Sequence, residues 1–356
     1  VDTVARLGGD EFAVLIEDFK DDTEVTTIIK RIQEDIEKPI ILDHHVIHIS
    51  SSIGVVITTE GYLKTEEIFR DADLAMYHAK EKGKANYKFF NDTLFERAVV
   101  TQQLESDLRS ALSNGEFELF YQPIVSVSEE TLQGFEALVR WNHPSLGIIS
   151  PDRFIPLAEE TGLILSIGTW VLQEACRQLK TWQIEAAKPD LTMNINVSVK
   201  QFLDQHLIDT VKYILEDLKL NPGTIKLELT ESLLMEHSNY AAEKIAELKK
   251  IGVNFVIDDF GTGYSSLSYL QKYPLDNLKI DKSFISEISD SSKENKLLNA
   301  IIGLAKSLNL HIICEGVETE TQYVFLKEQK ISSIQGYYFS KPLAFDDFIE
   351  FIKNNS

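Results

Sequence analysis

From Glu118 onward, short apolar runs rich in β-branched residues alternate with longer stretches in which apolar residues recur at helical spacing. Runs of this length are typical of buried strands, and the amphipathic stretches are typical of helices packed against them. The predicted strands are 119–125, 134–141, 192–197, 225–230, 253–258, 277–281, 311–315 and 334–338. Eight strand–helix repeats in about 240 residues are what a TIM-like (β/α)8 barrel requires, so we predict this α/β fold for residues 115–356. An open doubly wound sheet is the alternative, although no glycine-rich phosphate loop follows the first strand.

The first 92 residues alternate strand and helix in the same way but contain fewer elements. The expected elements are a strand at 12–16, a helix at 24–36, a strand or hairpin at 46–57 and a helix at 66–82. These make half of a two-layer α/β domain, and we expect the other half upstream. Apolar residues at helical spacing predict a connecting helix over residues 93–114.

Composition indicates a globular protein, because 44% of the residues are hydrophobic. No apolar run is long enough to cross a bilayer and no signal pattern begins the chain, so we expect a cytoplasmic protein with no membrane segment of its own, compatible with an upstream membrane or sensor region. Cys176 and Cys314 lie far apart in unrelated patterns, and we interpret both as buried free thiols.

The formal net charge of −21 is the next constraint. Nucleic-acid polymers bind basic surfaces, so a strongly acidic protein is not expected to bind them. A small phosphate-containing ligand would need metal ions to reverse the charge locally.

Most of the predicted barrel strands end in polar side chains. In a barrel, the C-terminal ends of the parallel strands converge on one mouth, so residues far apart in the sequence can share one site. The polar residues at these ends are Glu136, Asn194, Asn196, Glu228, Asp258, Asp259, Lys279, Asp281, Glu315 and Gln335.

Carboxylates with amides form a hard, oxygen-rich set that suits Mg²⁺ or Mn²⁺ rather than zinc. Each residue alone also has a structural interpretation. Glu228 or Asn196 could cap the next helix, Lys279 could simply pair with Asp281, and Gln335 could satisfy backbone groups. Their common position at the ends of successive strands favours a shared site.

Residues 98–356 resemble the EAL-domain cyclic di-GMP phosphodiesterases. The strings that carry the resemblance are Tyr121-Gln122-Pro123-Ile124, Glu136-Ala137-Leu138, Asn196-Val197-Ser198, Glu228-Leu229-Thr230-Glu231-Ser232, Asp258-Asp259-Phe260-Gly261-Thr262-Gly263, Leu278-Lys279-Ile280-Asp281, Glu315-Gly316-Val317-Glu318 and Gln335-Gly336-Tyr337-Tyr338. The resemblance implies hydrolysis of cyclic di-GMP to linear pGpG with two Mg²⁺ or Mn²⁺ ions. The alternative is a cyclic di-GMP receptor that does not hydrolyse its ligand.

The resemblance also implies roles for single residues. The implied metal ligands are Glu136, Asn196, Glu228, Asp258, Asp259 and Glu315. Lys279 would contact the attacking water, and Glu315 would bind metal or assist proton transfer. The implied substrate contacts are Gln122, Arg140, Asp281 and Gln335. Glu231 would anchor the Gly-Thr-Gly loop, which in the family couples dimer packing to metal binding, so a homodimer is expected.

Near the start of the chain, Arg6-Leu7-Gly8-Gly9-Asp10-Glu11-Phe12 places two glycines between strand-like runs. On turn statistics alone this is a hairpin turn followed by polar residues. The string also resembles the signature of GGDEF diguanylate cyclases, which would place Gly8 and Gly9 beside a guanine nucleotide and make Asp10 and Glu11 metal ligands. In that family GTP binds an intact domain, whereas only its second half is represented here, so cyclase activity of this polypeptide is not expected.

Overall fold

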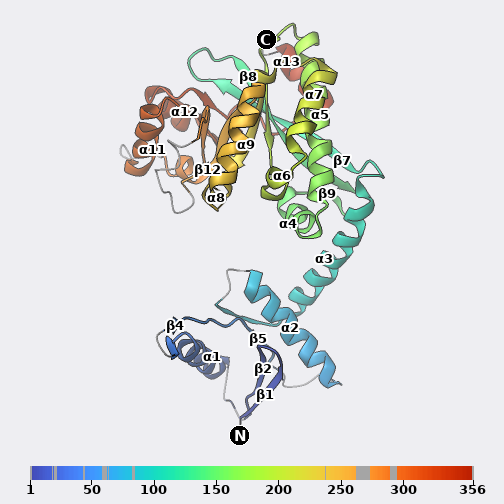
Figure 1. Cartoon of the computed structure of the whole chain (residues 1–356), viewed down its shortest axis with the longest axis vertical. Helices are drawn as coiled ribbons and strands as arrows, with labels where there is room; N and C mark the ends of the chain where they lie inside the picture. The colour runs from blue at the N-terminus through green and yellow to red at the C-terminus, as the bar shows by residue number, and fades with distance from the viewer. Residues whose placement is uncertain are drawn as a thin grey trace. The chain divides into compact units, whose positions relative to one another are not determined.

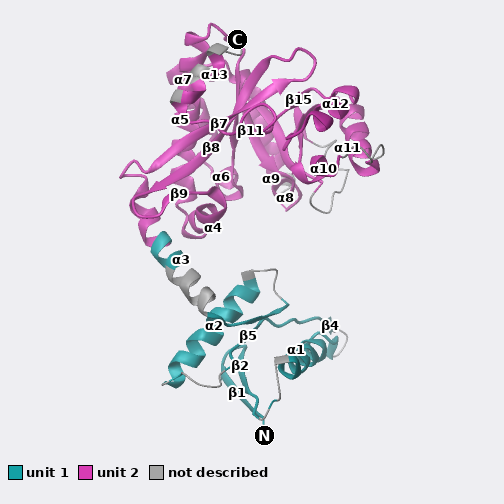
Figure 2. Ribbon diagram, turned by 180° about the vertical axis from the view of Figure 1, so that it is seen from behind, with its two compact units in different colours: residues 1–104 teal, residues 105–356 magenta. Residues whose placement is uncertain are grey.

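The computed structural model describes residues 2–17, 19, 22–42, 45–57, 62, 64–81, 85–236, 238–261, 273–288 and 295–354. The chain divides into two compact units, residues 1–104 and residues 105–356 (Figure 2). Helix α3 (Asp92–Ala111) begins in the first unit and ends in the second. The domain limits expected at residues 92 and 114 stay a prediction. None of the described helices is both long enough and apolar enough to cross a membrane.

The described residues of the first unit form three two-stranded sheets, the two helices α1 (Asp22–Ile36) and α2 (Thr65–Glu81), and the start of α3. Strands β1 (Thr3–Gly8) and β2 (Glu11–Leu15) form an antiparallel hairpin, as do β3 (Ile40–Leu42) and β4 (His45–Ile47). Strands β5 (Ile53–Val55) and β6 (Tyr87–Phe89) pair in parallel. The predicted helices correspond to α1 and α2, whereas the stretch expected as one strand or hairpin at 46–57 divides into β4 and β5.

A small apolar core made of Val25, Ile29 and Val55 holds this unit together. Gly54 lets α2 pack closely on β5, because a Cβ atom at this position would lie 1.9 Å from the carbonyl oxygen of Ala72. Any side chain at residue 54 would therefore push the helix away from the strand.

The second unit is a closed barrel of eight strands with helices outside the ring (Figure 1). The ring order is β8, β10, β11, β12, β13, β14, β15 and β7, and β7 pairs with β8 to close it. The strands are β7 (Phe117–Ser126), β8 (Leu132–His143), β10 (Thr192–Asn196), β11 (Ile225–Thr230), β12 (Asn254–Phe260), β13 (Asn277–Ile280), β14 (His311–Cys314) and β15 (Ser333–Ile334), with a short β9 (Gly147–Ile149) beside β8. The predicted TIM-like barrel is confirmed.

The helices outside the ring pack an apolar face against the barrel, as α11 (Lys296–Ser307) illustrates. In α11, Leu298, Ile301, Ile302 and Ala305 are buried at the i, i+3, i+4 and i+7 positions of one helical face. The remaining helices are α4 (Pro151–Thr161), α5 (Ile164–Glu185), α6 (Val199–Leu203), α7 (Leu207–Leu218), α8 (Glu231–Glu236), α9 (Ser238–Ile251), α10 (Lys282–Ser286), α12 (Glu320–Glu328) and α13 (Phe345–Asn354), with a 3₁₀ turn at Pro222–Thr224.

Strand β7 departs from a regular (β/α)8 repeat, because it runs antiparallel to both β8 and β15. The five residues 127–131 between β7 and β8 are too few for the crossover that two parallel strands need, so the chain makes a hairpin here. The hairpin register places Gln122 opposite Glu136. Gln122 therefore reaches the same mouth as Glu136 from the middle of β7.

The last predicted strand, 334–338, is also shorter than expected. Strand β15 ends at Ile334, and the chain then turns through residues 336–339. Gly336 is needed at this turn, because a Cβ atom there would lie 2.2 Å from the carbonyl oxygen of Val317.

Both cysteines are buried and free, as expected from the sequence. Burial raises the pKa of the Cys176 thiol to about 12 and also raises the pKa of Cys314. Since the thiolate is the reactive form, we expect neither cysteine to react with Ellman's reagent in the native protein at pH 8, and both to react in guanidinium chloride. Rapid release of thionitrobenzoate from the native protein would show that a thiol is accessible.

Candidate active site

Polar side chains from β8, β11, β12, β13 and the end of β14 meet at the C-terminal mouth of the barrel around Lys279. The Lys279 ammonium nitrogen lies 2.9 Å from Glu136 Oε2, 2.9 Å from Glu228 Oε2 and 2.5 Å from Glu315 Oε1. Asp258 Oδ1 follows at 3.6 Å. The side chain of Lys279 is only 1% exposed. One buried cation is thus surrounded by four carboxylates.

This arrangement replaces the structural interpretation in which Lys279 pairs with Asp281. Asp281 instead begins helix α10, where its Oδ1 accepts a hydrogen bond of 2.9 Å from the backbone N–H of Ser283. The carboxylate of Asp281 therefore caps a helix at the edge of the mouth.

Glu136 is held by three donors. Asn196 Nδ2 donates to Glu136 Oε1 at 2.7 Å, and Gln335 Nε2 and Lys279 Nζ donate to Oε2 at 2.6 and 2.9 Å. Burial by itself favours the neutral acid, but Lys279 and the two amides outweigh it and lower the pKa of Glu136 below its ordinary value. Asn196 and Gln335 thus both donate hydrogen bonds to the Glu136 carboxylate. The alternative roles, a helix cap for Asn196 and hydrogen bonds to the backbone for Gln335, are wrong.

The pKa of Glu228 is shifted in the opposite direction to that of Glu136. Burial and the neighbouring Glu136 raise its pKa well above the ordinary value, against the opposing effect of Lys279. Its side chain points into the barrel and does not cap the helix that follows, so the capping alternative for Glu228 is wrong as well. A carboxylate destabilised in this way gains from any added positive charge nearby.

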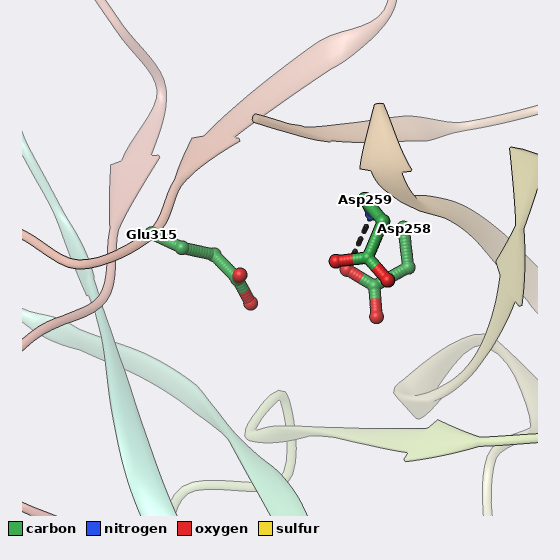
Figure 3. Close-up of side chains that lie close together, drawn as sticks. All are labelled: Asp258, Asp259 and Glu315. Atoms are coloured by element: carbon green, nitrogen blue, oxygen red, sulfur yellow. Dashed lines mark hydrogen bonds between the residues drawn. The ribbon is translucent and has the colours of Figure 1, made fainter. Parts of the chain in front are cut away.

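Asp258, Asp259 and Glu315 form the outer part of the mouth. One carboxylate oxygen of each lies within 4.8 Å of the others, and Glu315 points across the mouth toward the two aspartates (Figure 3). Burial, together with Glu136 and Asp258, raises the pKa of Glu315 to about 7. The three carboxylates are close enough for one cation to contact all of them.

Two adjacent aspartates can reach one site only because the strand is irregular. Successive side chains of a strand normally point to opposite faces. Here the pairing of β12 with β13 shifts register between Ile257 and Phe260, and Asp259 has φ = 54°, a left-handed conformation that aspartate tolerates better than most residues. The irregularity turns Asp259 toward the mouth beside Asp258, whose Oδ1 accepts the backbone N–H of Asp259 at 3.0 Å.

The donor set fits a divalent cation that prefers oxygen ligands. Five carboxylates gather around a single ammonium group, so the mouth carries an excess of negative charge in a largely buried place. Carboxylates so close together repel each other unless cations lie between them. Among the described residues, the group close enough to hold a cation contains no histidine or cysteine, the ligands typical of zinc.

Gln122 and Arg140 lie further from Lys279. Gln122 Oε1 accepts a hydrogen bond of 2.9 Å from Gln335 Nε2, and its own amide donates to the carbonyl oxygen of Ser340 at 3.3 Å. Arg140 lies on the same face of β8 as Glu136, half-buried, with its guanidinium 5.7 Å from the ring centre of Phe120. Both side chains could contact a ligand that binds above the carboxylates.

Comparison with known proteins identifies this kind of barrel. Residues 105–342 match the family model described as EAL domain. The chain belongs to the EAL-domain family. Residues 1–86 of this EAL protein match the model described as diguanylate cyclase, GGDEF domain, so both predicted resemblances are confirmed.

Two relatives of this EAL protein match it over both the GGDEF part and the EAL part. It is 40% identical over 348 residues to the bifunctional diguanylate cyclase/cyclic di-GMP phosphodiesterase MucR of Pseudomonas aeruginosa, covering 98% of this chain and 50% of MucR. It is 36% identical over 340 residues to the cyclic di-GMP phosphodiesterase PdeR of Escherichia coli, covering 96% of this chain and 51% of PdeR. The chain therefore spans about half the length of these curated relatives.

A solved structure also resembles the EAL barrel. It is described as the PaMucR phosphodiesterase in complex with c-di-GMP, and it is 43% identical to this chain with a TM-score of 0.66. The match covers 69% of this chain and 99% of the other.

In the EAL barrel, Glu231 begins helix α8 and is 4% exposed. Its Oε2 accepts a hydrogen bond of 3.3 Å from the backbone N–H of Gly261, the first glycine of the predicted Gly-Thr-Gly loop. Thr262 and Gly263 lie outside the described residues. The role of Glu231 as an anchor of that loop stays a prediction.

Asn194 supports the site, although sequence reasoning gave it no role. It is fully buried, and its Nδ2 donates to Glu228 Oε1 at 2.7 Å. The available signal was its spacing, because Asn194 and Asn196 are two residues apart and so share one face of β10. Asn194 orients Glu228 as Asn196 orients Glu136.

We expect Asn194→Leu to weaken the site. Leucine is similar in size to asparagine but has no N–H group to donate to the buried Oε1 of Glu228. The free energy of unfolding should fall by about 2 kcal/mol, and the affinity for Mn²⁺ by about tenfold or more. Urea denaturation and Mn²⁺ titration calorimetry would measure the two effects. Asn142→Leu is the matched control, since Asn142 is exposed and donates to Glu118 outside the cluster; equal losses in both variants would contradict the assigned role.

In the GGDEF part, Gly8, Gly9, Asp10 and Glu11 form the turn between β1 and β2 and are all exposed. Gly9 has φ = 51°, and its carbonyl oxygen accepts two hydrogen bonds from Arg6, at 3.1 and 2.6 Å. The predicted hairpin turn is confirmed. Within the part of the chain that the structure describes, the acids grouped closely enough to hold a metal are those at the barrel mouth. The metal and nucleotide roles of the turn residues stay predictions.

Proposed function

We propose that this EAL protein is a metal-dependent phosphodiesterase that hydrolyses cyclic di-GMP to linear pGpG. The observation that carries the proposal is the cluster around Lys279, where Glu136, Glu228, Asp258 and Glu315 surround one buried ammonium. The names of MucR and PdeR, and the c-di-GMP complex of a similar barrel, support the choice of substrate.

The residues that would hold two Mg²⁺ or Mn²⁺ ions are Glu136, Asn196, Glu228, Asp258, Asp259 and Glu315. When bound, such ions supply a water activated at neutral pH and positive charge for the phosphate oxygens. Asn196 would have to turn its amide oxygen toward the site, because its Nδ2 donates to Glu136 in the structure.

The chain's own residues would then direct the reaction. The Lys279 ammonium would orient the attacking water and stabilise negative charge as the water oxygen bonds to phosphorus. Glu315 would accept the proton of that water, since a carboxylate with a pKa of about 7 exchanges protons near neutral pH. The P–O3′ bond breaks, a proton joins the ribose O3′, and the ring opens to pGpG.

Substrate contacts would come from the rim of the mouth. Arg140 presents a planar guanidinium that can donate two hydrogen bonds to a phosphate or to a guanine edge. Gln122 and Gln335 are already hydrogen-bonded to each other and can contact the sugar-phosphate ring. Asp281 retains one carboxylate oxygen beyond its helix cap for a guanine N–H.

The second candidate is a receptor that binds cyclic di-GMP without hydrolysing it. We expect chromatography of the products to show pGpG formed from cyclic di-GMP in the presence of Mg²⁺, and no pGpG in the presence of EDTA. Tight binding of cyclic di-GMP with no linear product at saturating Mg²⁺ or Mn²⁺ would support the receptor instead.

A further inference from the structure

The opposite end of the barrel contains a hollow of about 800 Å³, surrounded by the first residues of the strands and by the loop 187–191. The interior layers of a TIM barrel are usually filled by bulky apolar side chains. The strand residues that line this hollow include polar ones from six different strands: Thr192, Lys226, Asn254, Asn277, His311 and Ser333. This end of the barrel is therefore an open hollow with polar side chains in its wall, and not a packed core.

An apolar layer separates the hollow from the acidic mouth. Ile124, Val256 and Ile313 pack together inside the barrel, each at most 1% exposed. Lys226 and Glu228 lie two residues apart on the same face of β11, one on each side of this layer. The hollow is therefore a separate site that does not depend on the phosphodiesterase proposal.

Two polar side chains in the hollow have no partner of their own. Asn277 is 95% buried, with 5% of its surface exposed, and no described residue forms a hydrogen bond with its side-chain amide. Half-buried Lys226 likewise has no ion pair or hydrogen bond within the described part of the chain. Neither side chain has a polar atom that is shut off from solvent without a partner, so both groups reach the open hollow and are available there to a bound molecule.

The charges in the hollow favour an anion. Asp276, which also lines it, is already neutralised by Lys249 at 2.7 Å and accepts the backbone N–H of Phe255 at 2.8 Å. Glu129 and Asp190 are exposed at the rim. The interior thus presents the positive charge of Lys226, and its volume is in the range of ordinary small-molecule sites.

We propose that the hollow binds a small organic anion, with a carboxylate or phosphate group on Lys226 and a hydrogen-bonding part against Asn277. Such a pairing is a charge-assisted hydrogen bond, which is stronger than one between neutral groups. Asn277 can both donate to and accept from the ligand, which favours a polar molecule over a fatty acid.

The test is calorimetric titration of the full chain with two probes, inorganic phosphate and succinate, which distinguish phosphate from carboxylate recognition. We expect at least one probe to bind the native protein, and Lys226→Met to weaken that binding about tenfold or more. Lys250→Met removes an exposed cation from the end of α9, outside the hollow, and should leave this binding unchanged. Failure of both probes to bind, or binding that is kept in full in Lys226→Met, would overturn the proposal.

Asn277→Asp provides a second variant in case Lys226→Met does not fold. It keeps the size of the side chain but places a negative charge in the hollow, so binding of the same probe should again fall about tenfold. Unchanged binding in Asn277→Asp would contradict the proposed site. Because these titrations measure probe binding alone, their outcome is independent of whether cyclic di-GMP is hydrolysed.

Discussion

Replacing Glu136 with glutamine should lower kcat for cyclic di-GMP by about 10³-fold or more, because in the proposed mechanism Glu136 holds a metal ion that stabilises the transition state by several kcal/mol. Glutamine has the same size as glutamate and can still bond Asn196 or Gln335, so the fold should be kept. What is lost is the negative charge that Lys279 and a divalent cation would share. Initial rates of pGpG formation at saturating Mg²⁺ would measure the effect.

Glu160→Gln is the matched control for this experiment. Glu160 lies on helix α4 with an exposed side chain, and the same chemical change there should leave kcat within about twofold, as expected of surface substitutions. A Glu136→Gln protein that keeps its circular dichroism spectrum and also its activity would remove Glu136 from the proposed mechanism.

Replacing Lys279 with methionine should destabilise the protein strongly when divalent cations are removed by EDTA. The substitution leaves the buried carboxylates of Glu136 and Glu228, and the partly exposed carboxylate of Glu315, without their ammonium partner. Breaking a buried ion pair costs about 3–5 kcal/mol. Saturating Mn²⁺ should recover much of this loss, since bound cations would supply positive charge among the same carboxylates. Urea denaturation with EDTA and with Mn²⁺ would measure the difference.

The control for Lys279 is Lys250→Met, which removes an exposed lysine from the end of α9. Its effect on unfolding should stay below about 0.5 kcal/mol with or without Mn²⁺. If Lys279→Met lost the same stability in EDTA and in Mn²⁺, the carboxylates would not form a cation site, whatever their distances. Activity of Lys279→Met should also be low, because the water would lose the group that orients it.

The barrel could be predicted largely from hydrophobic patterning, because buried parallel strands are short apolar runs with clear ends. The strand predicted at 225–230 has the limits of β11 itself. The direction of β7 could not be predicted from such runs, since an apolar run has the same pattern in either direction. Only the five-residue connection to β8 carries that information, through the length that a parallel crossover requires.

The site could be predicted in composition but not in geometry. Polar residues at strand ends must meet at one mouth of a barrel, and the structure places Glu136, Glu228 and Lys279 together there. The sequence does not show that Asp259 takes a left-handed conformation, because that conformation results from the irregular pairing of β12 with β13. It likewise does not show that Asn194 bonds Glu228, since that contact depends on how adjacent strands are staggered.

The most direct measurement is an anomalous-scattering map of crystals soaked in Mn²⁺. The proposed function predicts peaks at the C-terminal mouth of the barrel, within about 2.0–2.5 Å of carboxylate oxygens from Glu136, Glu228, Asp258, Asp259 or Glu315. No peak at this mouth at millimolar Mn²⁺, or peaks only elsewhere on the protein, would contradict the claim that these acids gather to hold the cations of a phosphodiesterase.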